Sequence, residues 1–315
     1  GIKDLTGSLE SRQAYLIVIS GPQVGKMFRL AQNITIGRSV DCDVHLDDEG
    51  ISRQHARVEQ DEFGNAVILD LGSTNGTYFN GTRISRYQLR DGDKIQVGST
   101  TILKFSYQDS LEEAFHQHQY ESATKDPLTG IYNKKYFSEQ LTKDFSYALR
   151  HNEVTSLIIF DIDRFKKVND TYGHDVGDRA LLRIAEVLEK HRRETDICCR
   201  YGGEEFAVVL DQTNGETAQR VAERLRLEVQ RTVFTAKDER VYLRLSAGVA
   251  AYPELFVKDG KELLVLADEA LRTAKSQGRN RSLLHLGRGK YRKSDGTEVD
   301  VDEPPPKPEA PTLFA

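Results

Sequence analysis

The pattern of apolar residues changes once along the chain, and this change constrains the fold more than any other feature. Up to residue 107, short β-branched and aromatic runs alternate with Gly, Asn and Asp turns, whereas after residue 125 apolar strands alternate with long amphipathic helices. A chain of 315 residues has room for about two domains. We therefore predict a multidomain protein, with an N-terminal all-β sandwich and a C-terminal α+β domain whose central sheet is flanked by helices.

The all-β domain is predicted over residues 14–107, after an N-terminal tail of residues 1–13. Two Asn-Gly pairs, Asn75-Gly76 and Asn80-Gly81, mark tight connections in which a positive φ is needed. The strand-like runs have the lengths and spacing of a sandwich. These runs are AYLIVIS, NITIGR, ARVEQ, AVILDL, KIQVG and TILKFSY.

A linker helix is predicted over residues 108–124, where apolar residues recur at helical spacing before the helix-breaking pair Asp126-Pro127. The α+β domain is predicted over residues 125–287. The run VTSLIIFDID predicts a central strand. The runs DICCRY and EFAVVL flank a Gly-Gly turn and predict a β-hairpin. Three further segments have the apolar period of amphipathic helices. Residues 288–315 are polar and then proline-rich, so a disordered tail is predicted there.

Composition narrows the classes of function. A net charge of −5 gives no general attraction to polyanions, so we expect no nucleic-acid partner. No apolar run approaches the ~20 residues that span a bilayer, and residues 1–13 lack the pattern of an export signal, so no membrane insertion is expected. Three cysteines cannot form a disulfide framework, which fits a reducing, cytoplasmic location.

Three loops of the first domain concentrate polar side chains that suit a phosphate group, because charge-assisted hydrogen bonds from arginine are strong. They contain the motifs GRSVDCDVHL, ISRQHARV and LGSTNGTYFNG, which together resemble the forkhead-associated (FHA) domain, a phosphothreonine-binding sandwich. The resemblance implies that His55 braces the loops. The implied phosphothreonine-binding residues are Arg38, Ser52, Arg53, Thr74 and Asn75. The ligand is expected to be a phosphothreonine protein or this chain's own tail phosphorylated on Thr6.

The second domain carries a different constellation, of carboxylates. The run LIIFDIDRF puts Asp161 and Asp163 on one face of a strand, because strand side chains alternate with period two. The turn RYGGEEF adds Glu204 and Glu205 after two glycines. Carboxylates from two adjoining elements can bind a hard cation such as Mg²⁺, which neutralises phosphate charge in phosphoryl chemistry.

The motifs FDIDRFKKVND, GHDVGD, RYGGEEF and KSQGRNR resemble those of the GGDEF family, diguanylate cyclases that make cyclic di-GMP from two GTP molecules. The resemblance assigns Mg²⁺, with Mn²⁺ as the alternative ion, to Asp161, the backbone carbonyl of Ile162, and Glu204. It gives Glu204 the further role of helping to deprotonate the ribose 3′-hydroxyl, with Glu205 as an acidic partner. Asp163 is either a further metal ligand or a structural carboxylate.

The same resemblance implies how GTP binds. Asn169 and Asp178 would bind the guanine edge, and a carboxylate there favours GTP over ATP because adenine lacks guanine's paired donors. Lys166, Lys275 and Arg279 would contact the triphosphate. The 3′-oxygen of one GTP attacks the α-phosphorus of another, twice, so two domains must face each other in a homodimer that is at least transient.

The segment Arg193-Glu194-Thr195-Asp196 precedes the signature turn at the offset of the family's RxxD product-inhibition site. Arg193 and Asp196 are thus expected to contact cyclic di-GMP, with Arg224 as a further arginine. The complete prediction is a diguanylate cyclase with an FHA sensor and product inhibition. One alternative is a non-catalytic phosphoprotein adaptor that binds cyclic di-GMP as a receptor, and another is a cyclase with mixed or adenine products.

Overall fold

The computed structural model describes residues 13–61, 63–236 and 239–301, and the chain folds into two compact units that divide between Ala123 and Thr124. Thr6 and the rest of the N-terminal tail up to residue 12 lie outside the described residues. Within them, no helix combines the length and the apolar character needed to cross a bilayer. Each unit has its own hydrophobic core.

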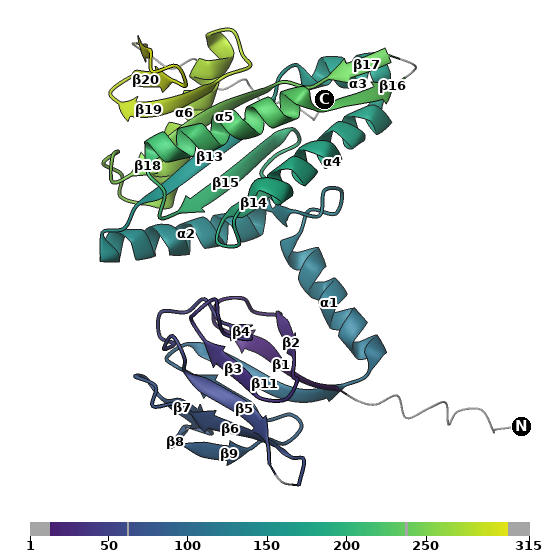
Figure 1. Ribbon diagram of the computed structural model, residues 1–315, viewed down its shortest axis with the longest axis vertical. Coiled ribbons are helices and arrows are strands. Elements are labelled where there is room, and N and C mark those ends of the chain that lie inside the picture. Colours follow the sequence, from purple (N-terminus) through teal and green to yellow (C-terminus); the bar gives the residue numbers. More distant parts are fainter. Residues whose placement is uncertain (1–12, 62, 237–238, 302–315) are drawn as a thin grey trace, which may run out of the picture. The chain divides into compact units, whose positions relative to one another are not determined.

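The first unit is the predicted β-sandwich. Its strands are coloured purple and blue in Figure 1. One sheet has the strand order β2-β1-β11-β10-β7-β8 and the other the order β4-β3-β5-β6-β9. Apolar side chains from both sheets form one core that includes Leu16, Ile36, Ile68 and Phe105. The strands are β1 (Gln13–Ser20), β2 (Met27–Arg29), β3 (Ile34–Gly37), β4 (Val44–His45), β5 (Ala56–Gln60), β6 (Ala66–Asp70), β7 (Thr77–Phe79), β8 (Thr82–Ile84), β9 (Arg86–Gln88), β10 (Lys94–Val97) and β11 (Thr101–Gln108).

The predicted linker segment contains helix α1 (Ser110–Thr124), which follows β11 almost directly. Asp109 caps the helix, because its side chain accepts hydrogen bonds from the backbone N–H groups of Leu111 and Glu112. The Glu112 carboxylate in turn accepts a hydrogen bond from the backbone N–H of Asp109, which completes a capping box.

The second unit is the predicted α+β domain, built on a sheet with the order β12-β14-β15-β13-β18-β19-β20-β21. Its strands are β12 (Tyr132–Asn133), β13 (Thr155–Ile162), β14 (Ile197–Arg200), β15 (Glu205–Asp211), β18 (Leu245–Tyr252), β19 (Ser282–Gly287), β20 (Lys290–Lys293) and β21 (Glu298–Asp300), with β16 (Val233–Ala236) and β17 (Glu239–Tyr242) forming a separate hairpin. Its helices are α2 (Lys134–His151), α3 (Phe165–Tyr172), α4 (His174–His191), α5 (Gly215–Arg231) and α6 (Gly260–Ser276).

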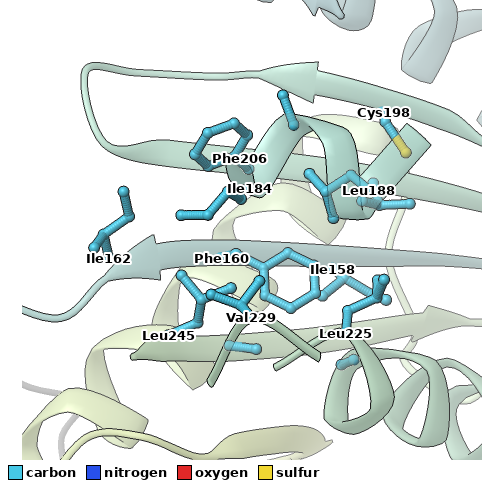
Figure 2. Close-up of a cluster of buried hydrophobic side chains, with 14 of the residues drawn as sticks. Ile158, Phe160, Ile162, Ile184, Leu188, Cys198, Phe206, Leu225, Val229 and Leu245 are labelled. Atoms are coloured by element: carbon cyan, nitrogen blue, oxygen red, sulfur yellow. The ribbon is translucent and has the colours of Figure 1, made fainter. Parts of the chain in front are cut away.

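Strand β13 is central, as predicted, and all its residues are buried because helices cover both faces of the sheet. Ile158, Phe160 and Ile162 point to the face covered by α4 and α5 (Figure 2). Leu157 and Ile159 point to the opposite face, where α2 and α6 pack. This two-sided burial fixes the end of β13, from which the acidic motif emerges.

The prediction of a disordered tail from residue 288 is wrong for residues 288–301. Strand β20 pairs with β19, and β21 pairs with β20, so this segment continues the sheet. Tyr291 is fully buried against α6 and β19, and this one aromatic side chain anchors an otherwise polar hairpin. Residues 302–315, with the proline-rich segment, lie outside the described residues.

Candidate functional site

The carboxylates that the sequence groups together converge at the end of β13. Asp161 is the penultimate residue of the strand, only 4% exposed, and lies opposite Glu205 in the antiparallel pairing with β15. The backbone N–H of Ile162 donates a hydrogen bond to the carbonyl oxygen of Glu204 at 3.3 Å. The predicted hairpin of β14 and β15 thereby brings Glu204 and Glu205 to the strand that carries Asp161.

Lys275, in the last turn of α6, forms an ion pair with Asp161, with 2.6 Å between Nζ and Oδ2. Burial nevertheless raises the pKa of Asp161 to about 7, with nearby Glu204 and Glu205 adding to the rise and Lys275 opposing it. Burial also raises the pKa of Glu204. The corner therefore holds more negative charge than the protein neutralises by itself.

This donor set fits a magnesium ion. Mg²⁺ is commonly held by one or two carboxylates with substrate phosphates and waters completing its shell, rather than by an all-protein cage. In the described parts of the chain, no group of three or more His, Cys, Asp or Glu side chains is arranged to hold a metal ion. Two partly desolvated carboxylates with raised pKa values are the residues that a divalent cation would stabilise.

The structure separates Asp163 from Asp161. One Asp163 oxygen accepts a hydrogen bond from the Ser246 hydroxyl at 2.7 Å, and the other accepts one from the backbone N–H of Asn280 at 2.8 Å. These bonds join the end of β13 to β18 and to the segment between α6 and β19. Of the two roles left open by the sequence, the geometry favours the structural carboxylate.

The residues expected at a guanine site lie on two helices that pack together. Asn169 is on α3, and its side-chain oxygen lies so close to Gly177 on α4 that a methyl group at Gly177 would overlap it. Asp178 follows Gly177 and is exposed. The side-chain oxygen of Asn169 is buried and has no hydrogen-bond partner among the described residues.

The other predicted contacts to the triphosphate are less enclosed. Lys166 is exposed on α3, and Arg279 is exposed just after α6 in a left-handed conformation with φ of 63°. Lys275 alone among the three predicted cations is held by a described carboxylate. Lys275 thus lies with the acidic corner, whereas no ion pair with another described residue fixes the side chain of Lys166 or Arg279.

The RxxD segment forms a tight turn between α4 and β14. One oxygen of Asp196 accepts a hydrogen bond from the backbone N–H of Arg193 at 2.8 Å, while its other oxygen is buried without a partner among the described residues. Burial raises the pKa of Asp196, although the charges of Arg193, Arg192 and Arg224 oppose the rise. Arg193 and Arg224 are exposed, so both guanidinium groups are accessible around Asp196.

In the first unit, all the predicted phosphothreonine-binding residues line one pocket, together with Ser39, Gln54 and the segment Glu49–Ile51. The Ser52 hydroxyl accepts a hydrogen bond from the backbone N–H of Thr74, and the Asn75 amide donates one to the carbonyl of Gly50. A side chain at Gly37 would collide with the Arg53 carbonyl, so glycine permits the close approach of the first two loops.

His55 braces these loops, as the resemblance implies. Its fully buried ring accepts a hydrogen bond at Nδ1 from the Ser52 backbone and, with the proton then on Nε2, donates one to the Gly76 carbonyl. Burial lowers the pKa of His55, which keeps the ring neutral. Asp70, which the sequence did not single out, shapes the third loop by accepting hydrogen bonds from the Ser73 and Thr77 hydroxyls.

Comparison with known proteins agrees with both halves of this description. A family model described as "Diguanylate cyclase, GGDEF domain" matches residues 123–281, which is about half of the chain. The chain belongs to the GGDEF family. An FHA-domain model matches residues 34–98, so the GGDEF domain is preceded by an FHA domain.

Relatives of the GGDEF domain include proteins named as cyclases. The chain is 39% identical over 180 residues to probable diguanylate cyclase DgcC of Escherichia coli and 38% identical over 182 residues to response regulator PleD of Caulobacter vibrioides. These matches cover 56% and 58% of this chain but only 47% and 40% of those proteins. The GGDEF domain of DgcB from Caulobacter crescentus, solved with c-di-GMP, aligns with a TM-score of 0.50 and 31% identity, covering 52% of this chain and 94% of that one.

The GGDEF domain also contains a partly buried ion pair that the sequence patterns did not predict. Arg200 pairs with Asp126 at 3.2 Å and donates hydrogen bonds of 2.8 and 3.2 Å to the carbonyl oxygen of Gly203 in the signature turn. Asp126 also accepts two hydrogen bonds from Thr129. The link ties the start of the GGDEF domain to the turn that carries Glu204. In the sequence, Asp126 and Arg200 are only two charged residues far apart in the chain, so nothing local indicates that they pair.

Proposed function

We propose that this chain is a diguanylate cyclase that condenses two GTP molecules into cyclic di-GMP and releases two pyrophosphates. The observation that carries the proposal is the acidic corner, where Asp161, Glu204 and the backbone of Ile162 lie together beside Lys275. In each of two steps, the 3′-oxygen of one nucleotide attacks the α-phosphorus of another. Positioning and charge stabilisation would provide most of the catalysis.

In this proposal, Mg²⁺ is held by Asp161, Glu204 and the Ile162 carbonyl, and it would neutralise phosphate charge and acidify the attacking hydroxyl. Glu204 would help to accept the hydroxyl proton, with Glu205 as its acidic neighbour. Lys275, together with Lys166 and Arg279, would hold the triphosphate. Mn²⁺ would be able to replace Mg²⁺ at this site, because both ions prefer oxygen ligands.

Guanine recognition is proposed at Asn169 and Asp178. The unpartnered oxygen of Asn169 and the exposed carboxylate of Asp178 are both acceptors, and guanine presents N1 and N2 donors along one edge. Adenine lacks that donor pair, so it would leave these groups unsatisfied. Because one domain supplies one GTP site, two copies of the chain must meet at least transiently as a homodimer.

The direct test is to incubate the full chain with GTP and Mg²⁺ and to identify the product by mass. Cyclic di-GMP is the expected product, and ATP in place of GTP should give none. A chain that produces nothing, with or without a phosphothreonine partner, while still binding cyclic di-GMP would instead be the adaptor and receptor. A cytoplasmic location stays a prediction.

We propose that the FHA pocket reads phosphothreonine. Arg38 and Arg53 supply two cations to a pocket whose loops are held by Ser52, Thr74 and His55. The ligand would be a phosphorylated protein or the chain's own tail carrying phospho-Thr6. Binding would localise the enzyme or change how two copies meet.

For the FHA pocket, Arg38→Ala should weaken binding of a phosphothreonine peptide at least tenfold, because one charge-assisted contact contributes about 1.5–3 kcal/mol. Fluorescence anisotropy with tail peptides, phosphorylated and unphosphorylated at Thr6, gives the measurement. Arg57→Ala is the matched control, since Arg57 is exposed, pairs with Glu59 and does not line the pocket. Equal binding of the two peptides would remove Thr6 as the ligand, and equal binding by Arg38→Ala and Arg57→Ala would remove the assigned pocket.

We also propose that cyclic di-GMP inhibits its own synthesis at Arg193, Asp196 and Arg224. Because Arg193→Ala removes one charge-assisted contact to the product, the concentration of cyclic di-GMP needed for half-inhibition should rise at least tenfold. The initial rate without added product should stay within about twofold of that of the parent. Initial rates measured against added cyclic di-GMP provide the test, with Arg183→Ala as an exposed control elsewhere on α4. Inhibition that is unchanged in Arg193→Ala would place product binding elsewhere.

A further inference from the structure

A second charged pocket lies between the outer surface of α5 and the hairpin of β20 and β21, which is coloured yellow at the end of the sheet in Figure 1. We call it the hairpin pocket. One wall comes from α5 and the other from the hairpin. It is lined by Glu216, Gln219, Arg220, Glu223, Arg224, Leu227, Glu228 and Arg231 of α5 and by Arg292, Lys293, Ser294 and Gly296 of the hairpin.

The hairpin wall is held firmly against the helix. The buried side-chain amide of Gln219 donates a hydrogen bond to the backbone carbonyl of Arg292 at 2.6 Å. The turn at the tip is closed by a hydrogen bond of 2.8 Å from the backbone N–H of Lys293 to the carbonyl of Thr297. Tyr291, next to Arg292, is fully buried on the other side. The pocket is therefore part of the folded domain.

The hairpin lies outside the segment that the GGDEF family model matches, which ends at residue 281. The helix wall, by contrast, belongs to that segment. The hairpin pocket is thus lined partly by residues that lie beyond the matched segment.

The charges in the hairpin pocket are unbalanced. Its three glutamates are each paired with an arginine: Glu216 with Arg220, Glu228 with Arg231, and Glu223 with Arg226, which lies outside the lining. In the described part of the chain, no ion pair is formed by the three remaining cations of the lining. These are Arg224, Arg292 and Lys293.

We propose that the hairpin pocket binds a phosphate-bearing nucleotide through Arg224, Arg292 and Lys293. Guanidinium groups bind phosphate oxygens in pairs and also stack on planar rings, while Leu227 and the arginine stems offer apolar surface for a base. The pocket is distinct from the proposed product site in its hairpin residues. Both sites include Arg224, whose positive charge lowers the pKa of Asp196 in the proposed product site. In this one respect the hairpin-pocket proposal rests on the proposed function.

The test uses the full chain with Arg193→Ala, which weakens the proposed product site, and compares it with the same protein carrying Arg292→Gln and Lys293→Gln. Isothermal titration calorimetry without Mg²⁺ measures binding of cyclic di-GMP, pyrophosphate and inorganic phosphate. We expect cyclic di-GMP to bind the Arg193→Ala protein and the two hairpin substitutions to weaken that binding at least tenfold. Lys290→Gln, on the same hairpin but outside the lining, should change it less than twofold.

Equal affinity of cyclic di-GMP for the proteins with and without the hairpin substitutions would overturn the proposal. Pyrophosphate or phosphate binding as tightly as the dinucleotide would overturn the nucleotide assignment. Lys293→Gln by itself provides a second variant should the pair reduce the melting temperature. Because only binding is measured, a chain that makes no cyclic di-GMP would refute the proposed reaction without affecting this result.

Discussion

Glu204→Gln should reduce cyclic di-GMP synthesis at least about 1000-fold, which corresponds to about 4 kcal/mol of lost transition-state stabilisation. The substitution keeps the size of the side chain but removes its negative charge. That charge is held in a desolvated corner near Asp161 and Glu205, where it can bind a cation and accept a proton. A neutral amide can do neither well.

The measurement is the initial rate of product formation at saturating GTP and Mg²⁺. Glu139→Gln is the matched control, since Glu139 is exposed on α2, and it should have the activity of the parent. Both variants should unfold near the temperature of the parent. A Glu204→Gln protein that retains a tenth of the activity would exclude Glu204 from the catalytic roles proposed here.

Asp161→Asn should lose activity to a similar extent and yet make the metal-free protein more stable at pH 8. The pKa of Asp161 is raised by burial from 3.8 to about 7, so between these pH values the folded protein binds more protons than the unfolded chain. The free energy of unfolding therefore falls as pH rises through this window. Asparagine has no such penalty, and we expect a gain of about 1–4 kcal/mol at pH 8.

The gain should shrink as pH is lowered toward 4 and should disappear below pH 3.8, where Asp161 is protonated in both the folded and the unfolded states. Urea denaturation of the parent and the variant in chelator-containing buffer at several pH values measures it. Asp170→Asn, an exposed change on α3, serves as the control and should show no such trend. A loss of stability in Asp161→Asn at pH 8 would mean that the ion pair with Lys275 outweighs the cost of burying the carboxylate.

Local sequence patterns predicted the elements that depend on short-range physics. The apolar run before Asp161 predicted the central strand, and the two glycines predicted the hairpin at residues 196–210. The same patterns failed at the C-terminal segment, where one buried tyrosine and an available sheet edge order a polar hairpin. Composition averages over residues, so it cannot detect a single anchoring side chain.

The sequence by itself determined that there are two domains, the residue types of both candidate sites, and the family to which the chain belongs, because motifs and periodicity are local properties. Only the tertiary structure decided which of these residues meet. Lys275 reaches Asp161 from another helix, Asp163 is bound by Ser246 and Asn280, and Asp126 holds Arg200 against the signature turn. Contacts between residues 74 to 117 positions apart follow from how helices pack on the sheet, and no local pattern encodes them.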